Sequence, residues 1–271
     1  MAHIFCVANQ KGGVGKTTTT VNLSAGLAAL SQRVLMVDLD PQGNATMGSG
    51  VDKRELELSV YEVLIEGAEI AKAKVLSNWG DQQAHRMHKT YDILGASREL
   101  AAAELELVGM ENREKRLKQA LEKVDNDYDF VLIDCPPSLS LLTLNGLCSA
   151  NGVIVPMQCE YFALEGLTDL VNTIKQVHAN LNRELKIIGL LRVMFDPRVS
   201  LQVQVSDQLK AHFGDKVFNA VIPRNVRLAE APSFGLPGVV YDPNAKGSQA
   251  FIAFAKEMVE RIAKNLSLIH I

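Results

Sequence analysis

Cysteine is scarce in this 271-residue chain, and no long apolar run occurs in it. The four cysteines, Cys6, Cys135, Cys148 and Cys159, include no pair with CxxC spacing. The sequence therefore predicts buried or neutral thiols and no disulfide framework. No stretch approaches the ~20 apolar residues of a membrane-spanning helix, and no basic leader precedes the short apolar run at the N-terminus. These absences predict a cytoplasmic protein without a membrane anchor.

A strong charge of either sign is also missing. The chain has 28 Lys and Arg against 31 Asp and Glu, and its formal net charge is −3. Composition as a whole therefore gives no reason to expect a nucleic-acid partner. The distribution is uneven, however, because residues 175–227 hold nine Lys and Arg but four Asp and Glu. A local basic face can bind phosphate backbones despite an acidic total, although scattered, solvated lysines explain the same count.

Short apolar runs alternate with helical patterns along the chain. Strands are expected at 4–8, 34–37, 130–133, 153–156 and 187–194. Helices are expected at 18–30, 111–124, 139–148, 164–181, 201–213 and 247–265. Continuous apolar strands separated by helices predict an α/β fold, with one mostly parallel, twisted sheet covered by helices on both faces. Such sheets bind ligands at the carboxyl ends of their strands.

These elements predict a single domain over residues 1–265. The last six residues, 266–271, read Leu-Ser-Leu-Ile-His-Ile and follow a helix that we expect to be complete by Asn265. A common sequencing-adapter (transposon-end) DNA encodes this hexapeptide. We therefore hypothesise that residues 266–271 are a non-native tail produced by read-through.

The most informative segment lies between the first expected strand and the first expected helix. It consists of Lys11, Gly12, Gly13, Val14, Gly15, Lys16, Thr17 and Thr18. A strand, a Gly-rich turn and Gly-Lys-Thr at the start of a helix predict a phosphate-binding loop. Backbone N–H groups turn inward around the anion, and the helix N-terminus adds a favourable dipole. Lys16 is expected at the β- and γ-phosphates and Thr17 at Mg²⁺; a Gly-rich turn without a ligand is the alternative.

This loop departs from the standard pattern G-x-x-x-x-G-K-[ST]. Gln10 stands where the pattern has its first glycine, and Lys11 adds a second cation. One lysine is sufficient to hold phosphate, so Lys11 is predicted to have a separate role.

Three carboxylates follow expected strands. Asp38 and Asp40 leave the end of the second strand, where alternate residues point the same way, and Asp134 ends a run of four apolar residues. The latter is the Walker-B arrangement, which places a carboxylate near Mg²⁺ or its waters. Of Asp38 and Asp40, one can help hold Mg²⁺ through water and the other can orient the attacking water. Aspartates that only cap a loop are the alternative.

Together these segments make the chain resemble the ParA/Soj family of partition ATPases, which share the deviant phosphate loop of the ParA/MinD group. The resemblance extends to about Asn265. It also rests on Asp-Leu-Asp-Pro-Gln-Gly-Asn-Ala-Thr at 38–46, Asp-Cys-Pro-Pro-Ser at 134–138, Gln-Cys-Glu-Tyr-Phe-Ala-Leu-Glu-Gly at 158–166, and Ile-Pro-Arg-Asn-Val-Arg-Leu-Ala-Glu-Ala-Pro-Ser at 222–233.

The resemblance implies a weak ATPase that uses ATP and Mg²⁺ and forms an ATP-bound homodimer. In it Lys11 acts across the dimer on the partner's nucleotide, and Gly12 lies where the two subunits approach closely. Asp40 positions the hydrolytic water, Asp134 is the Walker-B carboxylate, and Pro223 lies near the adenine.

The resemblance also implies non-specific binding of double-stranded DNA, hydrolysis stimulated by a ParB-type partner, and a place on the nucleoid. Arg198 and Arg227 fall at positions that contact DNA in Soj-like proteins, although Arg198 also fits a plain loop arginine. Val193 departs from the family pattern, because a valine side chain cannot hydrogen-bond the base. Arg192 either extends the basic face or pairs with an acid.

Two other functions remain open at the level of sequence. A MinD-like membrane switch requires a basic amphipathic helix at the C-terminus, and 247–265 resembles a packing helix instead. A metabolic or reductase enzyme on the same scaffold is the other; its iron–sulfur form requires paired cysteines at a dimer interface, and the four cysteines lack such a placement.

Overall fold

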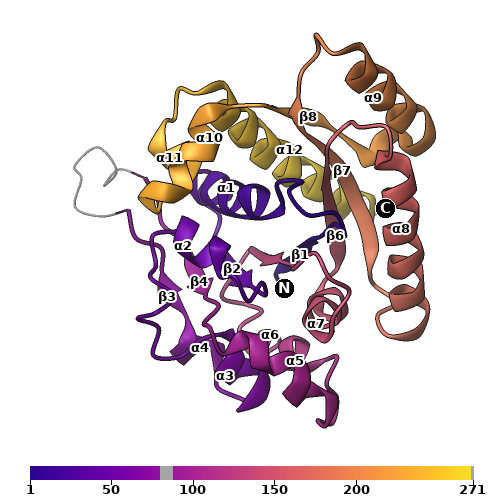
Figure 1. Ribbon diagram of the computed structural model, residues 1–271. Helices are drawn as coiled ribbons and strands as arrows, with labels where there is room; N and C mark the ends of the chain where they lie inside the picture. Colours follow the sequence, from indigo (N-terminus) through magenta and orange to yellow (C-terminus); the bar gives the residue numbers. More distant parts are fainter. Residues whose placement is uncertain (80–87, 270–271) are drawn as a thin grey trace.

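The computed structural model, which describes residues 1–79 and 88–269, contains one eight-stranded sheet between helical layers (Figure 1). The strand order is β3-β4-β2-β5-β1-β6-β7-β8, and every neighbouring pair is parallel except β3 and β4. The strands are β1 (His3–Val7), β2 (Val34–Asp38), β3 (Val75–Leu76), β4 (Asp92–Leu94), β5 (Phe130–Asp134), β6 (Gly152–Met157), β7 (Lys186–Phe195) and β8 (Val217–Pro223). The predicted α/β fold with a mostly parallel sheet is confirmed.

Helices cover both faces of this sheet. They are α1 (Lys16–Ala29), α2 (Asn44–Gly48), α3 (Val60–Ile65), α4 (Ile70–Ala73), α5 (Leu100–Val108), α6 (Arg116–Leu121), α7 (Leu141–Ser149), α8 (Ala163–Asn180), α9 (Ser200–Phe213), α10 (Val226–Glu230), α11 (Gly238–Tyr241) and α12 (Lys246–Ile269), with 3-10 turns η1 (Gly214–Lys216) and η2 (Ala231–Phe234). Figure 1 shows α1 and α12 on one side of the sheet and α7 and α8 on the other.

Alternate residues of each strand enter two separate cores. In β5, Val131 and Ile133 pack with α5, α6 and α7, whereas Phe130 and Leu132 pack with α1 and α12. All five residues of β5 are buried, as a strand covered on both faces requires. The sheet is therefore a rigid central layer whose carboxyl ends position the loops that follow β1, β2, β5, β7 and β8.

The structure corrects several of the expected elements. Strands β3, β4 and β8 were not predicted, and the helix expected at 111–124 is reduced to α6, Arg116–Leu121. The helix expected to be complete by Asn265 instead continues to Ile269. The hypothesis of a read-through tail at 266–271 concerns the DNA and stays a prediction.

All four cysteines are free and buried, as the sequence predicted. Burial raises the pKa of the Cys148 and Cys159 thiols to about 11. These cysteines therefore do not present paired thiols at a surface, which is what an iron–sulfur cluster shared by two subunits requires. Among the described residues, we find no helix long and apolar enough to cross a bilayer.

Candidate nucleotide site

The Gly-rich loop joins β1 to α1 at the carboxyl edge of the sheet. Gly13 and Gly15 have φ of 73° and 76°, a left-handed conformation that glycine adopts without the strain of a Cβ. Gly15 is the N-cap of α1, so the helix dipole is directed at the space enclosed by the loop. Lys16 folds over that space, and its Nζ donates a hydrogen bond to the carbonyl oxygen of Lys11 at 3.1 Å.

Lys16 lies largely inside the loop, with 8% of its surface exposed. Burial lowers its pKa, while the negative charges of Asp134 and Asp40 oppose that shift. A partly desolvated cation binds an incoming phosphate strongly, because little water has to be displaced.

Asp134 lies at the end of β5, fully buried beside the start of α1. Its two carboxylate oxygens accept hydrogen bonds from the hydroxyls of Thr17 at 2.7 Å and Thr20 at 3.0 Å. Burial and the charge of Asp38 raise the pKa of Asp134 to about 8, although the hydrogen bonds from the two hydroxyl groups lower it. A buried carboxylate held only by neutral donors fits a site built for a divalent cation, which would supply the missing positive charge.

Asp38 is the direct neighbour of Asp134 in the register of β2 and β5. Its carboxylate accepts hydrogen bonds from the Thr46 amide at 2.9 Å, the Thr46 hydroxyl at 2.7 Å and the Asp40 amide at 3.1 Å. Burial raises the pKa of Asp38 to about 6 despite these donors. Asp38 therefore fixes the turn after β2, and this turn presents Asp40, which is half-buried, at the mouth of the site.

Whereas Lys16 is buried, Lys11 lies at the surface of the loop. Its Nζ forms an ion pair with Glu160 Oε2 at 2.5 Å, and the side chains are 55% and 47% exposed. The amide of Lys11 donates to Asn9 Oδ1 at 3.0 Å, which anchors the tip of the loop. The two lysines of the loop thus have different surroundings: Lys16 is buried at the start of α1, and Lys11 lies at the surface beside the segment after β6.

An apolar recess of about 180 Å³ opens beside Thr18, between the ends of β7 and β8. Pro223 and Val193 line it, as do Met194 and Leu228. Met194 has a φ of 50°, in the left-handed region that side chains rarely adopt, and its Sδ accepts a hydrogen bond from Gln158 Nε2 at 3.1 Å. The recess is close enough to the phosphate loop to hold the flat base of a nucleotide. Its walls provide mainly apolar contact, in line with the absence of a hydroxyl at Val193.

A family model described as an AAA domain matches residues 2–187. The chain is 49% identical over 261 residues to the sporulation initiation inhibitor protein Soj of Bacillus subtilis, covering 95% of this chain and 98% of Soj. It is 46% identical over 261 residues to the chromosome partitioning protein ParA of Caulobacter vibrioides, covering 96% of this chain and 94% of that protein.

The chain belongs to the ParA/Soj family of partition ATPases.

A solved structure also resembles this ParA/Soj chain over nearly its full length. It is the cobyrinic acid a,c-diamide synthase from Mycobacterium smegmatis with bound ADP and magnesium. The two share 37% identity with a TM-score of 0.82, covering 98% of this chain and 97% of the synthase. The synthase was solved with ADP and magnesium bound to it, while the higher identity to Soj and ParA sets the family of this chain.

Arg198 and Arg227 lie at the same end of the ParA/Soj sheet as the phosphate loop. Arg198 follows β7 and is 88% exposed in its side chain, where it pairs with Asp196 at 2.7 Å. Arg227 lies on α10, after β8, and is 53% exposed in its side chain; it pairs with Glu230 at 3.0 Å and Asp242 at 3.4 Å. Both guanidinium groups are accessible from solvent.

Arg192 does not belong to that exposed set. It is 3% exposed, and it donates to Ser206 Oγ at 3.0 Å and to the carbonyl oxygen of Phe218 at 2.7 Å. No acid among the described residues forms an ion pair with it. Arg192 therefore joins β7, β8 and α9 from inside, and of the two roles considered for it from the sequence it has neither.

Three residues of the site were not given a role from sequence: Thr20, Thr46 and Glu160. Thr20 is the last member of a run of four threonines at the start of α1, and Thr46 closes the motif that begins at Asp38. Both threonines lie in motifs that the sequence displays, but the carboxylates that bind their hydroxyl groups lie on other elements. Glu160 lies within a quoted motif, yet its pairing with Lys11 spans 149 positions along the chain.

Proposed function

We propose that this ParA/Soj protein is an ATP-driven switch that segregates a chromosome or plasmid. Two copies close face to face in the ATP-bound state, bind DNA without sequence preference, and separate after hydrolysis that a ParB-type partner stimulates. The family membership supports partition ATPase activity, and the placement of individual side chains supports the finer steps that we propose.

The observation that carries this proposal is the different placement of the two loop lysines, one buried and one at the surface. Lys16 is buried, whereas Lys11 is half exposed at the loop tip. Gly12, beside it, has no positive φ, and a Cβ there would meet nothing within 4 Å. The described residues of a single copy thus give no steric reason for glycine at position 12. A second copy that approaches Lys11 and Gly12 closely supplies one.

The residues at the carboxyl edge suit magnesium and nucleotide. Thr17 would hold Mg²⁺ directly, with Asp134 and Asp38 acting through its waters; the bound ion supplies positive charge at the β- and γ-phosphates. Lys16 binds the same phosphates, and Pro223 contacts the base. Asp40, at the mouth of the site, orients the water for in-line attack. Lys11 of each copy neutralises phosphate charge in the other copy.

Arg198 and Arg227 then form the DNA-binding surface of the closed dimer. They would contact phosphates, so affinity is sequence-independent and falls steeply as salt is raised. DNA prefers the closed state and by reciprocity stabilises it.

A direct test is fluorescence anisotropy with a random-sequence DNA duplex. Binding is measured with ATP, with ADP and without nucleotide, at two salt concentrations, for the wild-type protein and two variants. We expect tight, salt-sensitive binding with ATP alone, its loss in Lys16→Ala, and its retention in Asp40→Ala, which no longer releases phosphate. Equal binding in all nucleotide states would refute the switch, and phosphate release by Asp40→Ala would refute the role of Asp40.

A further inference from the structure

The basic stretch at 175–227 has exposed cations near both ends of β7. Arg198 and Arg227 lie beyond its carboxyl end, near the nucleotide site. Lys186 is its first residue, and Lys216 directly precedes β8, at the other end. A strand of ten residues is roughly 30 Å long. The lysines at the far end therefore lie well away from the phosphate loop, and the proposed DNA-binding surface does not account for them.

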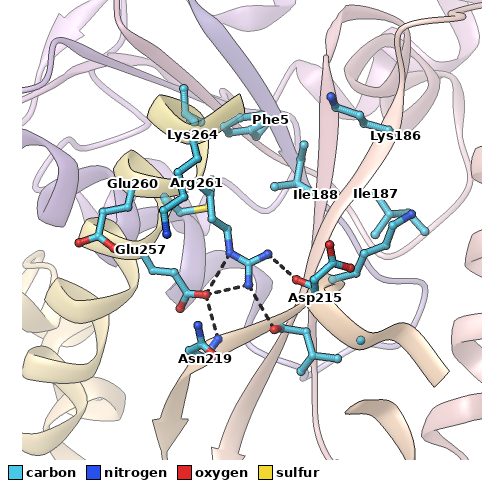
Figure 2. A pocket seen from close by; sticks show the side chains of 15 residues that line it. Phe5, Lys186, Ile187, Ile188, Asp215, Asn219, Glu257, Glu260, Arg261 and Lys264 are labelled. Carbon is cyan, nitrogen blue, oxygen red and sulfur yellow. Dashed lines mark hydrogen bonds and ion pairs between the residues drawn. The ribbon is translucent and has the colours of Figure 1, made fainter. Parts of the chain in front are cut away.

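Two adjoining cavities share this far end of the sheet. The larger, about 580 Å³, lies between α12 and the starts of β7 and β8 (Figure 2). Its central cation is already fully engaged. Arg261 pairs with Glu257 at 2.8 Å, donates to the carbonyl oxygens of Asp215 and Val217, and lies 4.6 Å from the ring centre of Phe218. Figure 2 shows this closed network, so Arg261 has no free guanidinium nitrogen for a ligand. Lys186 and Lys216 line this cavity as well as the smaller one.

The smaller cavity, about 410 Å³, lies between α8 and the turn before β8. We call it the lysine-rimmed groove. Its floor is apolar and consists of Val171, Ile174, Leu185, Ile187 and Phe213. Its rim carries Lys175, Lys186 and Lys216, all three exposed.

The charge of this rim is not compensated. No Asp or Glu is among the residues that line the groove, and within residues 1–79 and 88–269 no carboxylate forms an ion pair with any of the three lysines. His178, the remaining lining residue, shares a hydrogen bond with the carbonyl oxygen of Leu185 at 2.9 Å. Three lysines around an apolar floor repel one another. A ligand with a negative charge would reduce this repulsion, and an apolar part of the same ligand would fit the floor.

We propose that the lysine-rimmed groove binds an acidic segment of a partner protein, with one apolar side chain of that segment seated on the floor. Charge complementarity selects the acidic residues, and removal of apolar surface from water on both sides supplies the anchor. A DNA duplex has phosphates but no apolar group for the floor. A membrane surface is bound by apolar side chains that protrude, whereas Ile174 and Leu185 are recessed at 4% and 2% exposure.

The test uses the full-length protein without nucleotide and two fluorescein-labelled peptides. One peptide has leucines spaced among glutamates, and the other has serine at every leucine position. Anisotropy is measured for wild type, for K186E/K216E, and for the matched control K256E, whose exposed lysine on α12 lines neither cavity. We expect all variants to fold, because Lys186, Lys216 and Lys256 are exposed. Their melting temperatures check this.

We expect the leucine peptide to bind wild type and K256E equally and K186E/K216E about tenfold more weakly. The serine peptide should bind wild type at least as weakly. Equal binding of both peptides would show a diffuse charge effect and overturn the proposal, as would an unchanged affinity in K186E/K216E. A larger loss of duplex or of anionic-vesicle binding in K186E/K216E would assign the groove to nucleic acid or lipid instead.

This inference is independent of the proposed switch. K186E/K216E leaves Lys11, Lys16 and Asp40 untouched, so its ATP hydrolysis should equal that of the wild type. A negative peptide test therefore refutes only the proposal for the groove, and a negative DNA test refutes only the proposed switch.

Discussion

Replacing Glu160 by Gln should strengthen the ATP-bound dimer. In the single chain Glu160 holds Lys11 in an ion pair of 2.5 Å, and Lys11 must leave it to reach the nucleotide of a second copy. Glutamine keeps the size of the side chain but removes its charge. The variant therefore releases Lys11 before the dimer forms, and the free energy of breaking the pair no longer opposes closure.

The expected gain follows from the exposure of the pair. Two unit charges 2.5 Å apart attract by about 1.7 kcal/mol in water, but holding two long, half-exposed side chains offsets most of this, so exposed pairs contribute about 0–1 kcal/mol. A symmetric dimer breaks two pairs. With about 0.5 kcal/mol for each pair, the dimer dissociation constant should fall about fivefold, and the gain should shrink at high salt.

Sedimentation velocity across a protein concentration series gives this constant directly. The protein is loaded with Mg²⁺ and a non-hydrolysable ATP analogue, so that turnover does not empty the sites. Glu165→Gln is the matched control, because it removes an exposed carboxylate in the first turn of α8 that forms no ion pair with any described residue. An E160Q dimer that is weaker than wild type, or a gain equal to that of E165Q, would refute the reasoning.

Three further predictions concern stability. Gly15→Ala should lower the free energy of unfolding by about 1–2 kcal/mol in urea titrations, because φ is 76° there; Gly12→Ala should leave it unchanged but weaken the ATP-bound dimer in sedimentation. Burial and a neighbouring carboxylate raise the pKa of Asp134 to about 8, so the folded nucleotide-free protein holds a proton that the unfolded chain releases near pH 4. Its stability should therefore fall by up to about 1.4 kcal/mol per unit as pH rises from 5 to 8, and Asp134→Asn should flatten that slope. Arg192→Ala should destabilise the fold by about 3 kcal/mol, because the Ser206 hydroxyl and the Phe218 carbonyl oxygen would stay buried without a hydrogen-bond donor. Arg198 is exposed, so Arg198→Ala should leave the melting temperature unchanged and weaken only DNA binding.

The buried centre of the sheet was predictable, and its edges were not. Strands β2 and β5 are buried along their whole length, so each appears in the sequence as a continuous apolar run. β8 at the edge has exposed and half-buried positions at Asn219, Ala220 and Val221, which interrupts the apolar pattern. β3 and β4 have two and three residues, too few for a periodic signal. α5 was missed although Leu100–Val108 contains three consecutive alanines.

The site was predictable where a motif specifies backbone and was not where it depends on packing. Gly13 and Gly15 adopt the left-handed conformation that the loop pattern requires, and Asp134 ends its strand as expected. The hydroxyl partners Thr20 and Thr46 and the ion pair to Glu160 join elements far apart in the sequence. Their contacts depend on strand order and side-chain direction, neither of which a single sequence displays.

The strand order has a consequence for synthesis of the chain on the ribosome. β5 lies between β2 and β1, although both are made before it. Thr17 and its partner Asp134 are 117 positions apart. At ~5–20 residues per second, Asp134 is therefore added to the chain roughly 6–23 s after Thr17. During that interval two apolar strands have no central neighbour to pair with, and such unpaired edges are prone to aggregate. The nascent chain is thus most vulnerable before β5 emerges, and nucleotide can stabilise it only afterwards.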